Sequence, residues 1–98
     1  MNPLQSRYAN KVAVITGAGG GIGRAACVRL ASEGASIVAV DLDETALAET
    51  AELVEGAGAA VHSVIADVGD ASQVQQYVDE AVASFGGIDL LFNNAGIM

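Results

Sequence analysis

The 98-residue sequence is poor in cysteine, basic residues and aromatic side chains. Cys27 is the only cysteine, so the chain can form neither an internal disulfide nor a cysteine cluster, and we expect no metal site. The chain has four Lys and Arg residues but twelve Asp and Glu residues. The resulting net charge of −8 disfavours nucleic acid and anionic membrane surfaces as partners. No apolar run approaches membrane-spanning length, and residues 1–10 have no signal-peptide pattern. We therefore expect a cytoplasmic protein.

The abundant residues are small and aliphatic. Hydrophobic residues make up 52% of the chain and Phe, Trp and Tyr only 4%, which suits thin helices packed on a sheet that is covered on both faces. Short apolar runs alternate with longer segments of helical spacing, and this order predicts an α/β fold with a parallel sheet and right-handed crossovers. After an irregular tail at 1–10, we expect strands at 11–16, 36–40, 60–66 and 88–92 and helices at 22–33, 44–55 and 71–85.

Each predicted helix has an apolar face, and two of them have a capping residue. Asp43 is expected to cap the second helix, and Asp70 with Gln73 resembles a capping box at the start of the third. His62, in the third strand, has no acid, cysteine or second histidine near it in the sequence, and we interpret it as a surface or strand-edge histidine. The residues expected on the inner helix faces are Ile22, Gly23, Ala26, Cys27, Leu30, Ala46, Leu47, Thr50, Ala51, Leu53, Val54, Val74, Tyr77, Val78, Ala81, Val82 and Phe85.

A glycine-rich stretch, Thr-Gly-Ala-Gly-Gly-Gly-Ile-Gly, joins the first strand to the first helix. Glycines permit backbone conformations that side chains forbid, and they let a ligand come close. Free N–H groups and the positive end of the helix dipole then favour a phosphate or pyrophosphate. Gly17, Gly19 and Gly23 fit one register of the dinucleotide-binding fingerprint, but Gly20 and Gly21 also qualify, and a flexible loop is the alternative.

Distinctive groups follow all four predicted strands. After the glycine stretch on the first strand, the second ends in Asp41, eighteen residues beyond Gly23, which is near the spacing expected for an acid that binds a ribose. The third strand is followed by Asp67 and Val68, and the fourth by Asn-Asn-Ala-Gly at 93–96. Because ligands of such sheets bind at the carboxyl ends of the strands, this clustering favours a nucleotide site over four unrelated loops.

Together these motifs resemble those of the short-chain dehydrogenase/reductase family. The resemblance covers residues 10–98 and implies a partial, Rossmann-type doubly wound sheet with strand order 3-2-1-4. It implies that the glycine loop lines a pyrophosphate, that Asp41 binds the adenosine ribose, that Asp67 and Val68 border the adenine, and that Asn93 braces the central strands. The cofactor-binding residues expected on this basis are Gly17, Gly19, Gly21, Ile22, Gly23, Asp41, Leu42, Asp67, Val68, Asn94, Ala95 and Gly96.

The chemistry at Asp41 favours NAD over NADP as the cofactor. A carboxylate accepts hydrogen bonds from a ribose 2′-hydroxyl and repels a 2′-phosphate. No Arg or Lys lies within the glycine loop or just after Asp41 to neutralise such a phosphate, and Arg24, inside the start of the first helix, is the only candidate.

We expect no catalytic residue within this chain. The resemblance implies a tyrosine with a lysine four residues later, together with a serine, all beyond Asn-Asn-Ala-Gly, where the lysine helps the phenol exchange a proton with the substrate. Tyr8 and Tyr77 are followed at that distance by Val12 and Ala81. Residues 11–98 are therefore expected to be the NAD-binding half-domain of a homo-oligomeric enzyme that acts on an alcohol or carbonyl. Its substrate cannot be predicted from these residues.

Two other functions remain open at this point. The chain could be a non-catalytic dinucleotide-binding module, in which case a longer sequence would lack the Tyr-x-x-x-Lys pair. A methyltransferase that binds S-adenosylmethionine also uses a glycine loop and an acid after the second strand, although Asn-Asn-Ala-Gly argues against it. A thermal-shift comparison of NAD with S-adenosylmethionine distinguishes these two ligands.

Overall fold

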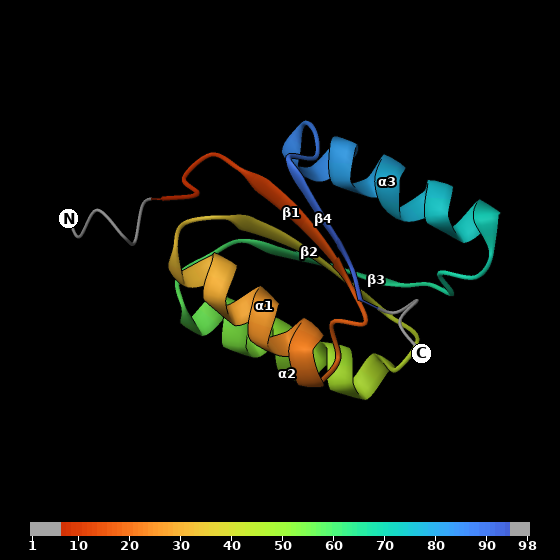
Figure 1. Cartoon of the computed structure of the whole chain (residues 1–98), viewed down its shortest axis with the longest axis horizontal. Coiled ribbons are helices and arrows are strands. Elements are labelled where there is room, and N and C mark those ends of the chain that lie inside the picture. The colour runs from red at the N-terminus through yellow and green to blue at the C-terminus, as the bar shows by residue number, and fades with distance from the viewer. Residues whose placement is uncertain (1–6, 95–98) are drawn as a thin grey trace.

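The computed structural model describes residues 7–94, which form a four-stranded parallel sheet with helices on both faces (Figure 1). The strand order is β3-β2-β1-β4, and every neighbouring pair is parallel. This order confirms the α/β class and the partial, Rossmann-type doubly wound sheet expected from the sequence. The elements are β1 (Val12–Thr16), α1 (Gly21–Ser32), β2 (Ser36–Asp41), α2 (Glu44–Gly56), β3 (Val61–Ile65), α3 (Ala71–Phe85) and β4 (Leu90–Asn93).

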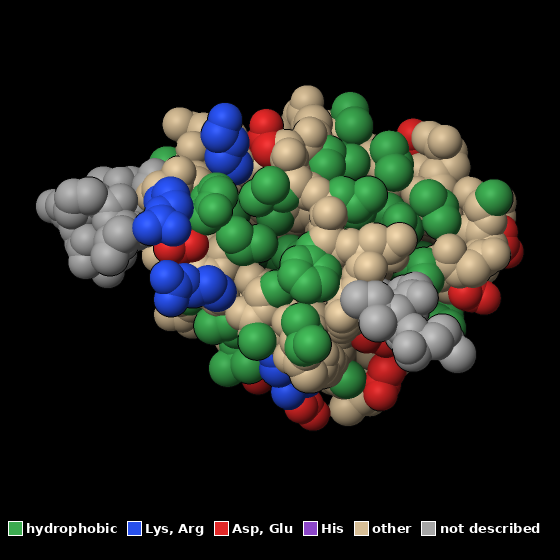
Figure 2. Space-filling view, in the orientation of Figure 1, with side chains coloured by type: hydrophobic (Ala, Val, Ile, Leu, Met, Phe, Trp, Pro, Cys, Tyr) green, Lys and Arg blue, Asp and Glu red, His purple; other side chains and the backbone are tan. Residues whose placement is uncertain are grey.

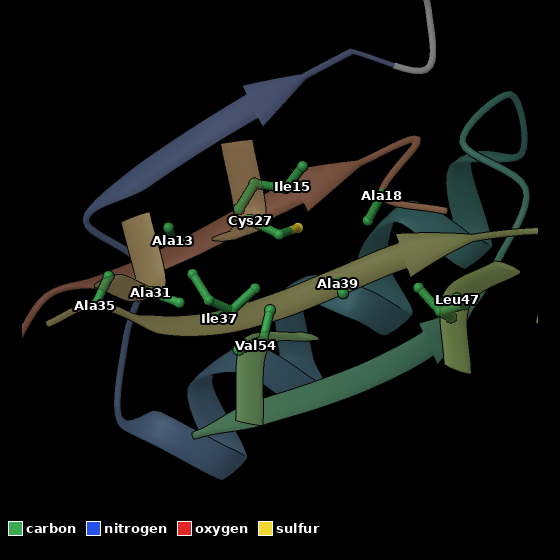
Figure 3. Packing of buried hydrophobic residues seen from close by; sticks show 10 residues of the cluster. All are labelled: Ala13, Ile15, Ala18, Cys27, Ala31, Ala35, Ile37, Ala39, Leu47 and Val54. Carbon is green, nitrogen blue, oxygen red and sulfur yellow. The ribbon is translucent and has the colours of Figure 1, made fainter. Parts of the chain in front are cut away.

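Helices α1 and α2 cover one face of the sheet and α3 covers the other (Figure 1). β1 is buried along its whole length and β2 along its four middle residues, because both lie inside the sheet between two helical layers. Continuous aliphatic runs are typical of strands in that position. On the face under α1 and α2, Ile15 and Ile37 pack with Cys27 and Leu47 from the helices (Figure 3).

The opposite face of the sheet packs against α3. Val14 and Val38, which alternate along the strands with the residues of the first cluster, meet Tyr77 and Ala81 from this helix. Burying each large apolar side chain contributes about 1.5–3 kcal/mol. The two clusters together therefore hold β1 and β2 in place and set the position of the loops that follow them.

Most predicted boundaries agree with the structure to within one residue, and two of the differences have a clear cause. β2 runs to Asp41, one residue further than expected, because the Asp41 carbonyl accepts the Ala66 N–H at 3.2 Å and extends the ladder with β3. β4 begins at Leu90, not at Ile88. The Asp89 N–H donates to the Val12 carbonyl at 2.9 Å, but the Val12 N–H donates back to the Asp89 carboxylate at 2.8 Å and not to a backbone carbonyl of β4.

Three side chains that the periodicity places on inner helix faces are exposed, and that part of the prediction is wrong. Ile22, Leu53 and Val82 are 67%, 48% and 50% exposed. Ile22 lies in the first turn of α1, next to the glycine loop. Leu53 and Val82 directly adjoin the buried Val54 and Ala81, so each lies about 100° around its helix from the buried face.

The described part of the predicted tail, residues 7–10, forms a turn that is held against the domain. The Tyr8 N–H donates to the Glu33 carbonyl at 2.8 Å, and the Tyr8 side chain packs against the cluster under α1 and α2. The carboxylate of Glu33, which is buried, pairs with Arg7 at 3.6 Å and with Arg29 at 3.4 Å. These contacts therefore hold the turn against the C-terminal end of α1.

β4 is the least covered strand. Leu90, Leu91 and Phe92 are 38%, 58% and 37% exposed. Figure 2 shows hydrophobic side chains gathered across the face over which β4 runs in Figure 1. Among the described residues, β4 pairs with β1 along one edge and with no strand along the other.

His62 does have an acidic neighbour, which the sequence does not place near it. Its Nε2 lies 2.8 Å from Glu80 Oε1, so β3 and α3 are joined across 18 residues of sequence. The hydrogen bond from His62, and after it one from Gln76, lowers the pKa of Glu80 below its usual value. The pair is a structural contact on the α3 side of the sheet, away from the glycine loop.

The pair makes stability depend on pH in a defined direction. Because the pKa of Glu80 is lower in the folded state, its contribution is present above the ordinary glutamate range and is lost as pH falls through the folded pKa. We expect Glu80→Gln to reduce the free energy of unfolding near neutral pH by about 0.2–1 kcal/mol, as for partly exposed pairs, and to reduce it less at pH 3. Urea unfolding at the two pH values, with Glu52→Gln as the control, measures this; a loss independent of pH contradicts it.

Candidate functional site

The glycine loop brings the end of β1 and the start of α1 into direct contact. Gly17 has a φ of +65° and Gly21 a φ of +55°, a left-handed conformation that glycine adopts without steric cost. A side chain on Gly23 would collide with the Gly17 carbonyl oxygen. Gly20, in contrast, has an extended backbone with a φ of −173° and open space where a side chain would point. The backbone therefore needs glycine at three of these positions and not at Gly20.

The first turn of α1 has no side chain that caps it. The N-cap residue, Gly20, has no group to accept a hydrogen bond, and the first turn contains no acidic residue. The first N–H groups of a helix have no partner within the helix, so those of Gly21, Ile22 and Gly23 can donate to a ligand. The helix dipole adds about half a positive charge at this end. Such a turn suits an anion.

Asp41 lies beside the glycine loop, at the end of β2. Its Oδ2 accepts the Gly19 N–H at 2.8 Å, and its Oδ1 accepts the Asp43 N–H at 3.0 Å. A carboxylate can accept about four hydrogen bonds, so capacity remains for hydroxyl groups of a ligand. Gly19 permits this close approach, because a Cβ there would lie 2.8 Å from Asp41 Oδ2.

An open cleft of about 190 Å³ joins these groups to the end of β3. It brings together five residues that the sequence predicts as cofactor-binding, and it adds Ala66, which is buried at the end of β3. Leu42 is 63% exposed and forms one apolar wall that a planar ring could cover. The lining residues are Gly17, Asp41, Leu42, Ala66, Asp67 and Val68.

Asp67 is held in place by the start of α3. Its N–H donates to Gln73 Oε1 at 2.6 Å, and its Oδ1 accepts the Gly69 N–H at 2.8 Å. Asp70 caps α3 as expected, accepting the Ser72 N–H at 2.9 Å, and hydrogen bonds from Ser72 lower the pKa of Asp70. The expected capping box does not form: the Asp70 side chain accepts from Ser72 and not from the Gln73 backbone N–H, and the Gln73 side-chain oxygen bonds to the Asp67 N–H and so orients the cleft wall.

The end of β4 supplies the last predicted group. Asn93 is in register with Thr16, and its Oδ1 lies 3.1 Å from Thr16 Oγ1, which agrees with a brace between the central strands. Asn94 follows and is half-buried. The predicted site residues Ala95 and Gly96 lie outside the described residues.

Two helical residues whose roles the sequence did not reveal form hydrogen bonds to the glycine loop. Thr50, fully buried on α2, donates from its hydroxyl to the Ala18 carbonyl at 2.7 Å. Arg24, considered above only as a partner for a 2′-phosphate, donates to the Gly19 carbonyl at 2.7 Å and to Thr50 Oγ1 at 2.9 Å. The one sequence signal that could have indicated this contact was Thr50, a polar residue within the apolar stripe of α2.

The described residues offer little other site chemistry. Burial raises the pKa of Cys27 to about 12, so its thiol stays protonated and unreactive at neutral pH. Within residues 7–94, no group of three or more His, Cys, Asp or Glu side chains could hold a metal ion. In the same part of the chain, no helix combines the length and apolar character that crossing a membrane requires.

A parallel sheet whose first strand leads through a glycine loop into a helix, with an acid after the second strand, has the arrangement of a dinucleotide-binding Rossmann-type domain. The chain belongs to the short chain dehydrogenase family, which it matches over residues 11–98.

Individual relatives agree with this assignment. Levodione reductase from Leifsonia aquatica is 47% identical over 94 residues, which cover 94% of this chain and 35% of that protein. The crystal structure of carveol dehydrogenase from Mycobacterium avium, in complex with NAD, has a TM-score of 0.88 at 38% identity, covering 94% of this chain and 38% of that one. A short chain dehydrogenase/reductase from Burkholderia phymatum, also in complex with NAD, has a TM-score of 0.83 at 48% identity, covering 86% and 30%. The chain thus spans about a third of the length of these relatives.

Proposed function

We propose that this chain forms the NAD-binding part of an oxidoreductase that interconverts an alcohol and a carbonyl group of a small molecule. The observation that carries the proposal is the Asp41 carboxylate, which lies against the glycine loop and lines the adjoining cleft. Family membership supports the type of reaction. The NAD complexes of the two solved relatives support the cofactor.

The residues present fit a dinucleotide without help from basic side chains. The N–H groups in the first turn of α1 would hold the pyrophosphate, and the contact between Gly17 and Gly23 leaves space for it because no Cβ intervenes. The ribose hydroxyls would donate to the free lone pairs of Asp41. The adenine would lie in the cleft between Leu42 and Val68, and 94–96 would run beside the rest of the cofactor.

When bound, the nicotinamide ring supplies the hydride acceptor or donor. The residues of this chain would bind and orient the cofactor, and proton transfer would need groups from elsewhere in the complete protein. Tyr77, on α3, is 4% exposed and packs against the sheet, and the Tyr8 backbone bonds to Glu33 at the end of α1. We therefore expect the 98-residue chain alone to show no dehydrogenase activity. Separately, we expect the complete protein to be a homo-oligomer.

Replacing Asp41 with Ala is expected to weaken NAD binding in the complete protein and to narrow its preference over NADP. A hydrogen bond to a charged group contributes about 1.5–3 kcal/mol, which corresponds to a rise of about 10- to 150-fold in the Kd for NAD. The affinity for NADP should fall less than that for NAD, because the Asp41 carboxylate repels the 2′-phosphate of NADP in the unchanged protein. Competition calorimetry with the two cofactors measures both effects.

Asp43→Ala is the matched control for this experiment. It removes the same charge two residues away, on an exposed side chain that accepts the Ala46 N–H at 3.0 Å and does not line the cleft. Its NAD preference should stay close to that of the unchanged protein. If the Asp41 variant also keeps its full preference for NAD, the assignment of the ribose site is wrong.

A further inference from the structure

The peptide group between Ala18 and Gly19 is hydrogen-bonded to side chains at both ends. Its carbonyl accepts the Thr50 hydroxyl at 2.7 Å, and its N–H donates to Asp41 Oδ2 at 2.8 Å. The two partners come from different elements, Thr50 from α2 and Asp41 from β2. The orientation of this peptide is therefore set by the protein and does not depend on a ligand.

Arg24 fixes the next peptide group and connects it to the same helix. Its Nη2 donates to the Gly19 carbonyl at 2.7 Å and to the Ala46 carbonyl at 2.9 Å, while its Nε donates to Thr50 Oγ1 at 2.9 Å. The same Nη2 lies 3.4 Å from Glu49, whose side chain is 61% exposed; an exposed pair of this kind contributes little. The guanidinium thus joins α1, the glycine loop and α2.

Thr50 uses both the donor and the acceptor capacity of its hydroxyl in this network. It accepts from Arg24 and donates to Ala18, and its side chain is fully buried. Valine has nearly the same shape but would leave the Ala18 carbonyl and the Arg24 Nε without these partners. Losing a buried partner costs more than the net value of one hydrogen bond, so the hydroxyl serves a purpose that packing alone does not require.

We propose that Arg24 and Thr50 are positioning residues of the dinucleotide site: they clamp the glycine loop to α2 and hold Gly19 against Asp41 before the ligand binds. This inference rests on the proposed function. The clamp keeps the first-turn N–H groups of α1 in the arrangement that receives the pyrophosphate. It also directs Nε and Nη2 of Arg24 at the protein, which takes them away from a 2′-phosphate and supports the choice of NAD.

The test compares Thr50→Val with Thr50→Ser in the complete protein, with NAD and adenosine as probes. Adenosine has the ribose but no phosphate, so it reports on Asp41 without the pyrophosphate site. Thr50→Val is expected to raise the Kd for NAD about tenfold and to change the Kd for adenosine much less, whereas Thr50→Ser restores NAD binding. Arg24→Gln should show the same pattern, and Arg29→Gln, on an exposed side chain of the same helix, should bind like the unchanged protein.

A purely structural role would lower the melting temperature of Thr50→Val and leave its Kd for NAD unchanged, or weaken both probes equally. Either result overturns the positioning role while NAD binding by the unchanged protein still supports the proposed function. If Thr50→Val does not fold, normal NAD binding by Arg24→Gln overturns it in the same way. Failure of the unchanged protein to bind NAD overturns the proposed function and this inference together.

Discussion

Substitution of Gly23 by Val is expected to abolish NAD binding in the complete protein. The new Cβ would collide with the Gly17 carbonyl oxygen, so α1 would have to move away from the end of β1. The pyrophosphate needs both the loop and the first turn of α1 at once, and separating them destroys its site. In isothermal titration calorimetry we expect no saturable binding, equivalent to a loss of at least about a hundredfold in affinity.

Gly20→Ser is the matched control, because it changes a glycine three residues away in the same loop. Gly20 has an extended backbone and open space where the new side chain would lie, and serine is a favourable N-cap residue. The variant should fold and bind NAD far better than the Gly23 variant. Equal losses at the two positions would show that the glycines are needed for a reason other than the contact between Gly17 and Gly23.

The fold could be predicted from local sequence patterns because each pattern is stable in only one kind of secondary structure and environment. The continuous aliphatic runs at β1 and β2 are stable only as strands covered on both faces, and the helices between them require parallel pairing. The capping residues Asp43 and Asp70 also lie where the sequence places them. Periodicity failed at Ile22, because the pattern does not say where the sheet beneath a helix ends.

The arrangement of the candidate site could be predicted where it depends on backbone geometry, but not where it depends on which side chains of two helices meet. Glycine at positions 17 and 23 indicates a close backbone contact, because only glycine lacks the Cβ that would prevent it. The contacts of Arg24 with Thr50 join residues 26 apart on two helices, and no local pattern predicts which side chains meet there. The same holds for His62 and Glu80, which come from β3 and α3.

The 98-residue chain expressed alone is expected to self-associate through β4. One edge of β4 pairs with β1, and among the described residues the other edge pairs with no strand. Leu91 and Phe92 are 58% and 37% exposed there, and an apolar strand with free backbone groups is a template for another chain. The net charge of −8 opposes association, but salt screens charges beyond about 8 Å, whereas strand pairing acts at contact distance.

Leu91→Lys tests this mechanism, because a charged side chain on an edge strand discourages pairing. Light scattering over a range of concentrations should show association for the unchanged chain and a mass close to that of the monomer for the variant. Leu53→Lys, on α2, removes a leucine of comparable exposure, 48%, away from β4 and should still associate. A monomeric unchanged chain with sharp cooperative melting, or equal effects of the two substitutions, contradicts the role of β4.

The most direct test of the central claim is a crystal structure of the complete protein with NAD bound. The prediction is that the adenosine ribose hydroxyls hydrogen-bond to the Asp41 carboxylate, at about 2.5–3.0 Å for O–H···O contacts. The pyrophosphate oxygens should accept the N–H groups of the first turn of α1, with the adenine beside Val68. An adenosine bound elsewhere, or a ribose turned away from Asp41, would contradict the claim that this edge of the sheet is an NAD site.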